Sequence, residues 1–81
     1  FLVTAPYEVG NETCPITMST HAGQEMDYIL SGQLRISING HEETMRAGDS
    51  VYYDSSKPHG MVAVGGTPCV FLAIVMGHGG A

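Results

Sequence analysis

Glycine and proline interrupt this sequence so often that helices of ordinary length cannot form. Eleven glycines and four prolines divide the 81 residues into short apolar runs. No stretch of about 12 residues keeps a helical repeat of apolar positions without one of these two breakers. The sequence therefore predicts short β-strands that are connected by turns.

About eight strands are expected, with connections of hairpin length. Leu34, Ile36 and Ile38 alternate with polar residues, which is typical of a strand with one buried and one wet face. Asn39-Gly40 follows, and this dipeptide favours the type I′ turn of a tight hairpin. The expected strands cover residues 1–5, 15–21, 25–31, 34–38, 41–46, 50–53, 59–64 and 69–76.

The regular succession of strands predicts an all-β chain that folds as one small sandwich or barrel. Residues 69–76 are apolar at successive positions, so this strand is expected to be buried on both faces. We interpret residues 1–81 as a single domain and a piece of a longer polypeptide, because the sequence begins at Phe1 without a methionine. The end of the chain, residues 77–81, is expected to be a flexible exit with a solvated His78.

The charge balance argues against two classes of partner. The formal net charge is −5, and the only cations are Arg35, Arg46 and Lys57. Three scattered cations cannot neutralise a run of phosphates, so no nucleic-acid contact by this domain and no binding to an anionic membrane are expected. No apolar run reaches the roughly 20 residues that span a bilayer. Cys14 and Cys69 are expected to be free thiols, which indicates a reducing, cytoplasmic location.

The residues with the clearest chemical potential are His21, Glu25 and His59. A break at Ala22-Gly23 places His21 at the end of one expected strand and Glu25 at the start of the next, and a hairpin can bring both to one interior. Two neutral imidazoles and one carboxylate form a ligand set for a divalent metal ion such as iron, zinc, nickel, copper or manganese. The alternative is a solvated His21 and a His59 that is hydrogen-bonded at a strand end.

The spacing of these residues resembles the first motif of the cupin superfamily, G-x5-H-x-H-x3/4-E-x6-G. The second histidine, the glutamate and the closing glycine of that motif correspond to His21, Glu25 and Gly32. Ser19 stands in place of the first histidine, and Thr13 stands in place of the leading glycine.

The second cupin motif, G-x5-P-x-G-x2-H-x3-N, is matched by Gly48 and His59 at the right separation. Its proline, second glycine and asparagine are replaced by Asp54, Ser56 and Ala63. The resemblance covers residues 19–63 and implies an all-β cupin-type double-stranded β-helix, a jelly-roll barrel of two sheets with a pocket between them.

The resemblance implies that His21, Glu25 and His59 hold a divalent metal ion without a fourth ligand from the protein, because Ser19 is a weak donor. This set is similar to the two-histidine, one-carboxylate triad of non-haem iron enzymes, so a metal-dependent oxygenase is one expectation. The amino-acid sequence at residues 25–30 and 58–61 resembles that of cupins fused to helix-turn-helix domains. This resemblance favours a second function, in which the domain is the sensor of a small-molecule ligand in a bacterial transcription regulator. A metal-free barrel that serves dimerisation is the third alternative.

Four further residues are predicted to line the ligand pocket. Asp27 follows Glu25 by two positions, so strand alternation directs both carboxylates to one side. Ser19 and Met61 are related in the same way to His21 and His59, and Tyr53 ends the preceding strand. For Met61 and Tyr53, simple core packing is the favoured alternative. His41, beside Glu42 and Glu43, is expected at a solvated hairpin tip instead of in a ligand cluster.

The strand that carries Glu25 is apolar on its second face as well. Met26, Tyr28 and Leu30 alternate with the residues that are expected to point inward. A small barrel has little material to cover an outer apolar face, so a homodimer is expected to bury it, with the first strand as the alternative cover.

Overall fold

The computed structural model describes residues 1–77 as an all-β chain; His78 and the rest of the predicted exit segment lie outside the described residues. The strands are β1 (Leu2–Ala5), β2 (Gln24–Ser31), β3 (Gln33–Ile38), β4 (His41–Arg46), β5 (Ser50–Asp54), β6 (His59–Val64) and β7 (Cys69–Met76). Within residues 1–77 there is no helix that could cross a membrane.

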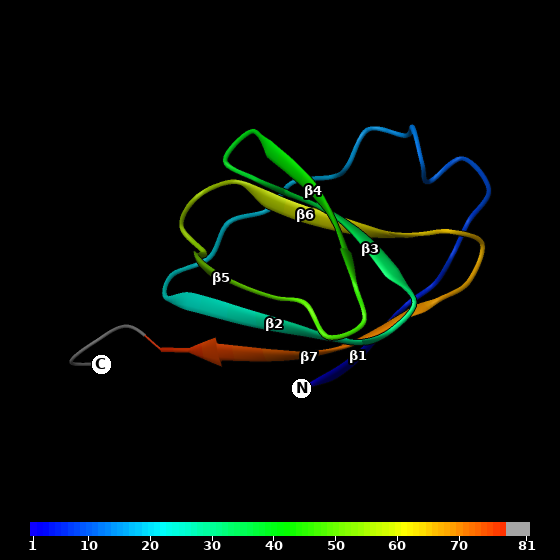
Figure 1. Cartoon of the computed structure of the whole chain (residues 1–81). Helices are drawn as coiled ribbons and strands as arrows, with labels where there is room; N and C mark the ends of the chain where they lie inside the picture. The colour runs from blue at the N-terminus through cyan, green and yellow to red at the C-terminus, as the bar shows by residue number, and fades with distance from the viewer. Residues whose placement is uncertain (78–81) are drawn as a thin grey trace.

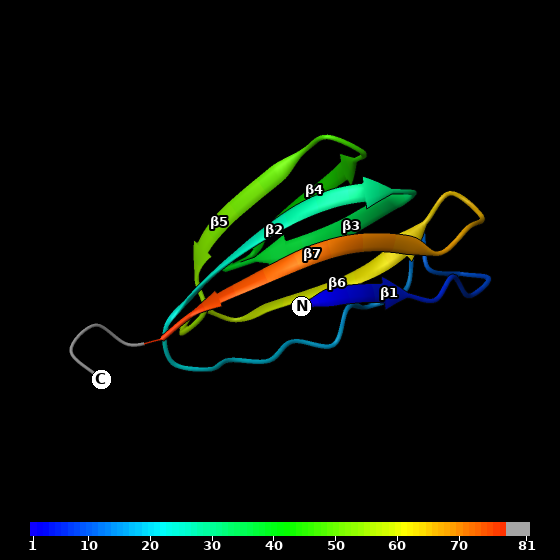
Figure 2. The same ribbon diagram turned by 90° about the horizontal axis from the view of Figure 1, so that it is seen from below.

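The strands form two antiparallel sheets that pack face to face (Figures 1 and 2). One sheet has four strands in the order β1-β7-β2-β5, and the other has three in the order β4-β3-β6. Consecutive strands alternate between sheets at several points, as a jelly roll requires. The predicted all-β jelly-roll barrel is confirmed.

Local turn chemistry fixes the register of β3 and β4. Asn39 and Gly40 have φ angles of 50° and 86°, the left-handed pair that a type I′ turn needs, so the predicted hairpin is confirmed. The resulting register pairs Ile38 with His41 and Leu34 with Met45. Gly32, the closing glycine of the first motif, has a φ of 79°, and a side chain there would collide with the carbonyl oxygen of Pro68.

The prediction of a strand over residues 15–21 is wrong. Only Ser19 forms an isolated bridge, with His59, and the rest of this segment is irregular. It runs along the outside of the three-stranded sheet (Figure 1), where Arg35 donates hydrogen bonds to the carbonyl oxygens of Asn11 and Cys14. Gly60 of β6 lies so close beneath it that a Cβ would meet the Thr17 carbonyl and the Ile16 side chain. The β-branched run covers a sheet instead of extending one.

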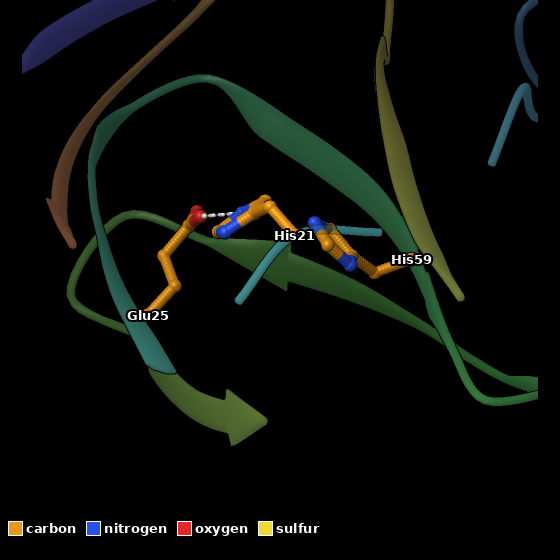
Figure 3. A group of neighbouring side chains, drawn as sticks. All are labelled: His21, Glu25 and His59. Atoms are coloured by element: carbon orange, nitrogen blue, oxygen red, sulfur yellow. Dashed lines mark ion pairs between the residues drawn. The ribbon is translucent and has the colours of Figure 1, made fainter. Parts of the chain in front are cut away.

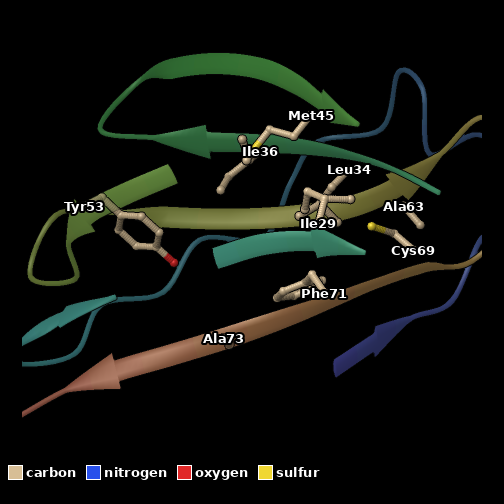
Figure 4. Packing of buried hydrophobic residues seen from close by; sticks show 9 residues of the cluster. All are labelled: Ile29, Leu34, Ile36, Met45, Tyr53, Ala63, Cys69, Phe71 and Ala73. Atoms are coloured by element: carbon tan, nitrogen blue, oxygen red, sulfur yellow. The ribbon is translucent and has the colours of Figure 1, made fainter. Parts of the chain in front are cut away.

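The core fills the space between the two sheets (Figure 4). Both sheets contribute inward-facing apolar side chains from alternate positions, as the period of two requires. Its members are Ile29, Leu34, Ile36, Met45, Tyr53, Ala63, Cys69, Phe71 and Ala73. Cys69 is buried within it, Cys14 is half-buried outside it, and both are free thiols.

The outer face of the four-stranded sheet is apolar and uncovered. The register aligns Leu2 with Leu72 and Tyr28, and Tyr52 with Met26 and Ile74, all on the side away from the core. Leu72 and Ile74 are therefore exposed, and the prediction that residues 69–76 are buried on both faces is wrong. The continuous apolar run of β7 reflects one core face and one open apolar face.

Candidate metal centre

His21, Glu25 and His59 converge at one open end of the barrel (Figure 3). His59 is the first residue of β6, and Glu25 is the second residue of β2. His21 lies in the segment before β2, which is held by a backbone hydrogen bond from the His21 amide to the Ser55 carbonyl, 2.9 Å. One ligand atom from each of the three side chains lies within 4.8 Å of the others. The folded chain therefore brings together the three residues that the sequence singles out.

Both imidazoles are oriented so that Nε2 is available to a metal. His59 Nδ1 lies 2.9 Å from the carbonyl oxygen of Lys57, and His21 Nδ1 lies 3.2 Å from that of Ala22. A carbonyl accepts a proton and cannot donate one, so each Nδ1 carries hydrogen and each Nε2 keeps its lone pair in the neutral ring. Metal-binding histidines are commonly fixed through the second nitrogen in this way.

The third donor, Glu25, is held in its ionised form. Burial raises the pKa of its carboxyl group, but interactions with Asp27 and Tyr53 and the nearby imidazoles of His59 and His21 bring the pKa below its ordinary value. Glu25 Oε1 lies 3.5 Å from His21 Nε2, the nitrogen that is free to act as a ligand. The ionised carboxylate of Glu25 therefore lies close to both imidazoles.

The predicted pocket residues Asp27 and Tyr53 are buried directly behind Glu25. Asp27 is fully buried, and burial together with the Glu25 carboxylate raises the pKa of Asp27 to about 8. The Tyr53 hydroxyl donates to Asp27 Oδ2 over 3.4 Å, and its pKa is raised by burial and by the two carboxyl groups. Asp27 Oδ1 has no hydrogen-bond partner among the described residues. At neutral pH the site thus pairs one ionised carboxylate with one protonated carboxyl group.

The other two predicted pocket residues differ in position. Ser19 is exposed but lies directly opposite His59, with backbone hydrogen bonds of 2.8 and 3.0 Å in both directions. Met61 is half-buried on the inner face of β6 and packs against the core. The Tyr53 ring belongs to the core as well and lies 5.0 Å from the His59 ring. The expectation of core packing therefore holds for Met61 and Tyr53.

Ser55 supports the candidate metal centre, although nothing in the sequence indicates this role. Ser55 is fully buried at the end of β5, and its carbonyl and amide fix the His21 and Gly23 backbone, respectively. Its hydroxyl has no hydrogen-bond partner within residues 1–77. A serine in a polar loop normally faces solvent, so only the tertiary structure could reveal this contact.

The donor set fits a divalent metal ion. Nitrogen and oxygen ligands bind such ions at about 2.0–2.2 Å, which brings neighbouring donor atoms closer together than 4.8 Å. The side chain of His21 is 41% exposed and can rotate to close this difference, whereas Glu25 and His59 are buried. Three protein ligands leave coordination positions open toward the mouth of the barrel. The three side chains thus form a possible site for a divalent metal ion.

Comparison with known protein families identifies the family of this chain. Residues 6–75 match the family described as "Cupin domain", and the chain belongs to this family. A comparison with curated protein sequences found no significant match.

Solved structures support the same fold. Hydroxypropylphosphonic acid epoxidase from S. wedmorenis is 21% identical with a TM-score of 0.76 over 93% of this chain and 41% of its own. A cupin protein from Bacteroides fragilis is 26% identical with a TM-score of 0.75, covering 99% of this chain and 65% of its own. A predicted oxalate decarboxylase from Thermotoga maritima is 32% identical with a TM-score of 0.69 over 75% of this chain and 54% of its own. The chain thus spans only about two fifths of the epoxidase and about half to two thirds of the other two proteins.

Proposed function

We propose that this cupin domain binds a divalent metal ion through His21, Glu25 and His59 and a small molecule beside it. The observation that carries the proposal is the convergence of one ligand atom from each of the three side chains, with Nδ1 of both imidazoles on a backbone carbonyl so that Nε2 is left for a metal. The metal would supply Lewis acidity and open positions for a ligand. Ser19, Asp27, Tyr53 and Met61 would line the pocket, and iron, zinc, nickel, copper and manganese all suit this donor set.

The test is a zinc titration of metal-free protein by calorimetry, because zinc does not change its oxidation state. His59→Ala should weaken zinc binding at least about 100-fold, since removal of a direct ligand costs more than removal of an outer partner. His41→Ala is the matched control, because His41 lies outside the triad, and it should bind zinc like the parent. Equal zinc affinity in His59→Ala and the parent would overturn the proposal.

We further propose that the domain serves as the cytoplasmic sensor of a bacterial transcription regulator, which accords with its two free cysteines. The support is the resemblance at residues 25–30 and 58–61 to cupins of such regulators. DNA contact would belong to a separate segment, because this domain has three cations and a net charge of −5. The coding sequence before Phe1 tests this role: a helix-turn-helix segment is expected there, and a start codon within a few residues would refute it.

A metal-dependent enzyme is the second candidate, and the buried pair of Asp27 and Tyr53 favours it. These buried groups can hold a proton behind Glu25. The epoxidase of similar fold has been solved as an Fe(II) protein in complex with its substrate. Dioxygen uptake by iron(II)-loaded protein separates the alternatives, because a sensor binds its ligand without consuming dioxygen.

A second copy of the chain would cover the outer face of the four-stranded sheet. Leu2, Leu72 and Ile74 on this face are between 38% and 67% exposed, and the face carries none of the described cations. Asp54, which pairs with Gln24, is the one acidic residue in the register of this face, and a chain of net charge −5 can approach its own copy most readily through a surface with so few charges. Patches of several hundred Å² on a single chain commonly mark an interface, and two-fold dimers are the commonest closed assembly.

Sedimentation analysis tests the homodimer. Leu72→Lys places a charge at the centre of the face and should give a monomer of unchanged fold. Thr44→Lys adds the same charge on exposed β4 and should leave the dimer intact. A parent chain that sediments as a monomer at high micromolar concentration would refute the dimer.

A further inference from the structure

The inner face of the three-stranded sheet continues past the triad to two polar side chains of β4. Met45 of β4 lies in the core opposite Leu34, so its direction defines the inner face of the strand. Glu43 and His41 are two and four residues from Met45 and are paired with Ile36 and Ile38. Directly paired residues project to the same side of a sheet. His41 and Glu43 therefore face the pocket side, although a hairpin tip is normally interpreted as solvated surface.

His41 lies in one row with a metal-binding residue. Ile38 of the central strand pairs with His59 on one side and with His41 on the other. Two strand spacings separate the outer members of this row, a distance of about 9.5 Å. His41 and Glu43 are 75% and 64% exposed in their side chains, and His41 Nε2 lies 2.9 Å from Glu43 Oε1. Because the opposite sheet does not cover them, the pair forms an open rim on the inner face of β4.

The surface between the triad and this rim is apolar. Ile38 lies between His59 and His41, and Met61 lies beside Ile36 in the next row. Both are only partly buried and pack against the core, so they can still contact a ligand. A molecule that extends from the triad to the rim would meet a polar end, an apolar middle and a second polar end.

Charge decides what the second end binds. Arg35, the cation of the central strand, lies on the outer face, where its guanidinium binds Glu42 at 2.8 Å. The inner face of β4 thus presents Glu43 beside the His41 imidazole and without a lysine or arginine, in a chain of net charge −5. A positive ligand group is favoured there over a negative one.

We infer that His41 and Glu43 form a distal recognition subsite, in which the Glu43 carboxylate binds the ammonium end of a small molecule whose acidic end binds the metal. This inference rests on the proposed function, because the triad must hold the metal that anchors the acid. The ligand class is an amino acid with an apolar chain between a carboxylate and a remote ammonium group.

The experiment measures binding of two matched acids to the zinc-loaded protein by calorimetry. ω-Aminohexanoate and hexanoate share the acid and the chain, and ω-aminooctanoate and octanoate extend the reach. At least one amino acid should bind about threefold to fivefold more tightly than its plain acid, the range for an exposed ion pair. Glu43→Gln should remove this preference without changing zinc affinity. Glu42→Gln is the matched control, because the adjacent carboxylate faces the opposite side, and it should keep the preference.

The outcomes separate the subsite from the metal centre. If zinc does not bind to the parent, both the metal centre and the subsite are refuted. If zinc binds but neither acid does, or if each amino acid and its plain acid have equal affinity, the subsite alone is refuted. An equal loss of preference in Glu42→Gln and Glu43→Gln would also overturn it, because a general charge effect would then explain the result.

Discussion

Replacement of Asp27 by asparagine should change how the stability of the protein depends on pH. Asp27 is fully buried, and its pKa is raised from 3.8 to about 8. The folded protein therefore holds a proton that the unfolded chain has lost at any pH between these values. Stability from this group is fully present below pH 3.8 and is lost as the pH rises toward 8. Asparagine cannot ionise, so the free energy of unfolding of Asp27→Asn should lack this dependence on pH.

The size of the effect follows from proton linkage. One proton of difference between the folded and unfolded states changes the free energy of unfolding by about 1.4 kcal/mol per pH unit. Between pH 5 and 7 the expected loss from Asp27 is therefore about 2.7 kcal/mol. For a domain of this size the loss corresponds to a fall in melting temperature of about 10 °C or more. The asparagine amide can donate to Glu25 as a protonated carboxyl does, so the variant should resemble the parent at pH 5 and exceed its stability at pH 7.

Urea denaturation of metal-free protein in the presence of a chelator measures this slope, with circular dichroism as the signal because the chain has no tryptophan. The control is Glu8→Gln, which removes the same formal charge from an exposed loop and should keep the slope of the parent. If Asp27→Asn loses as much stability as the parent between pH 5 and 7, Asp27 is not protonated in the folded protein and the reasoning fails.

Three further predictions concern the site and its support. Ser19→His should retain zinc through dialysis that strips the parent, because Ser19 lies directly opposite His59 and a third imidazole could reach the same point as a fourth ligand. Equal loss of zinc from the variant and the parent would show that the site does not accept this ligand. Zinc affinity should fall steeply below about pH 6, where protons compete for imidazole nitrogens, whereas the lowered pKa of Glu25 keeps its carboxylate available, and calorimetry at several pH values measures the fall. Gly60→Ala should destabilise the fold by about 3 kcal/mol or more in thermal denaturation, because its Cβ would meet backbone at Thr17, while Gly77→Ala, with open space around it, should be neutral.

The sequence was sufficient to predict the strands whose local signals agree with the fold. The alternation of Leu34, Ile36 and Ile38 and the Asn39-Gly40 turn act within a few residues and need no distant partner. The segment 15–21 is different, because a β-branched run satisfies strand propensity in isolation. Its true environment is the outer face of β3 and β6, where Arg35 and Gly60 fix it, and those contacts depend on the tertiary structure.

The three metal-binding candidates could be predicted because motif spacing preserves them even where Ser19 breaks the pattern. The properties of the groups around these three residues could not be predicted from the sequence, because those properties depend on burial and strand register. Asp27 becomes a protonated acid only through its position behind Glu25, and His41 joins the row of His59 only through two strand pairings.

The distribution of buried and open residues also fixes the direction from which a ligand must arrive. Ile29, Leu34 and Phe71 fill the space between the sheets on one side of the site, so a small molecule would have to reach the proposed metal site from another side. His59 and Glu25 are buried at this boundary, whereas His21 remains exposed and faces the mouth. Because His21 is the most exposed of the three candidate ligands, metal and ligand affinity should be coupled through the position of His21. A small molecule that contacts the bound metal would then hold His21 in place. The same linkage between ligand binding and metal binding would operate in a sensor and in an enzyme.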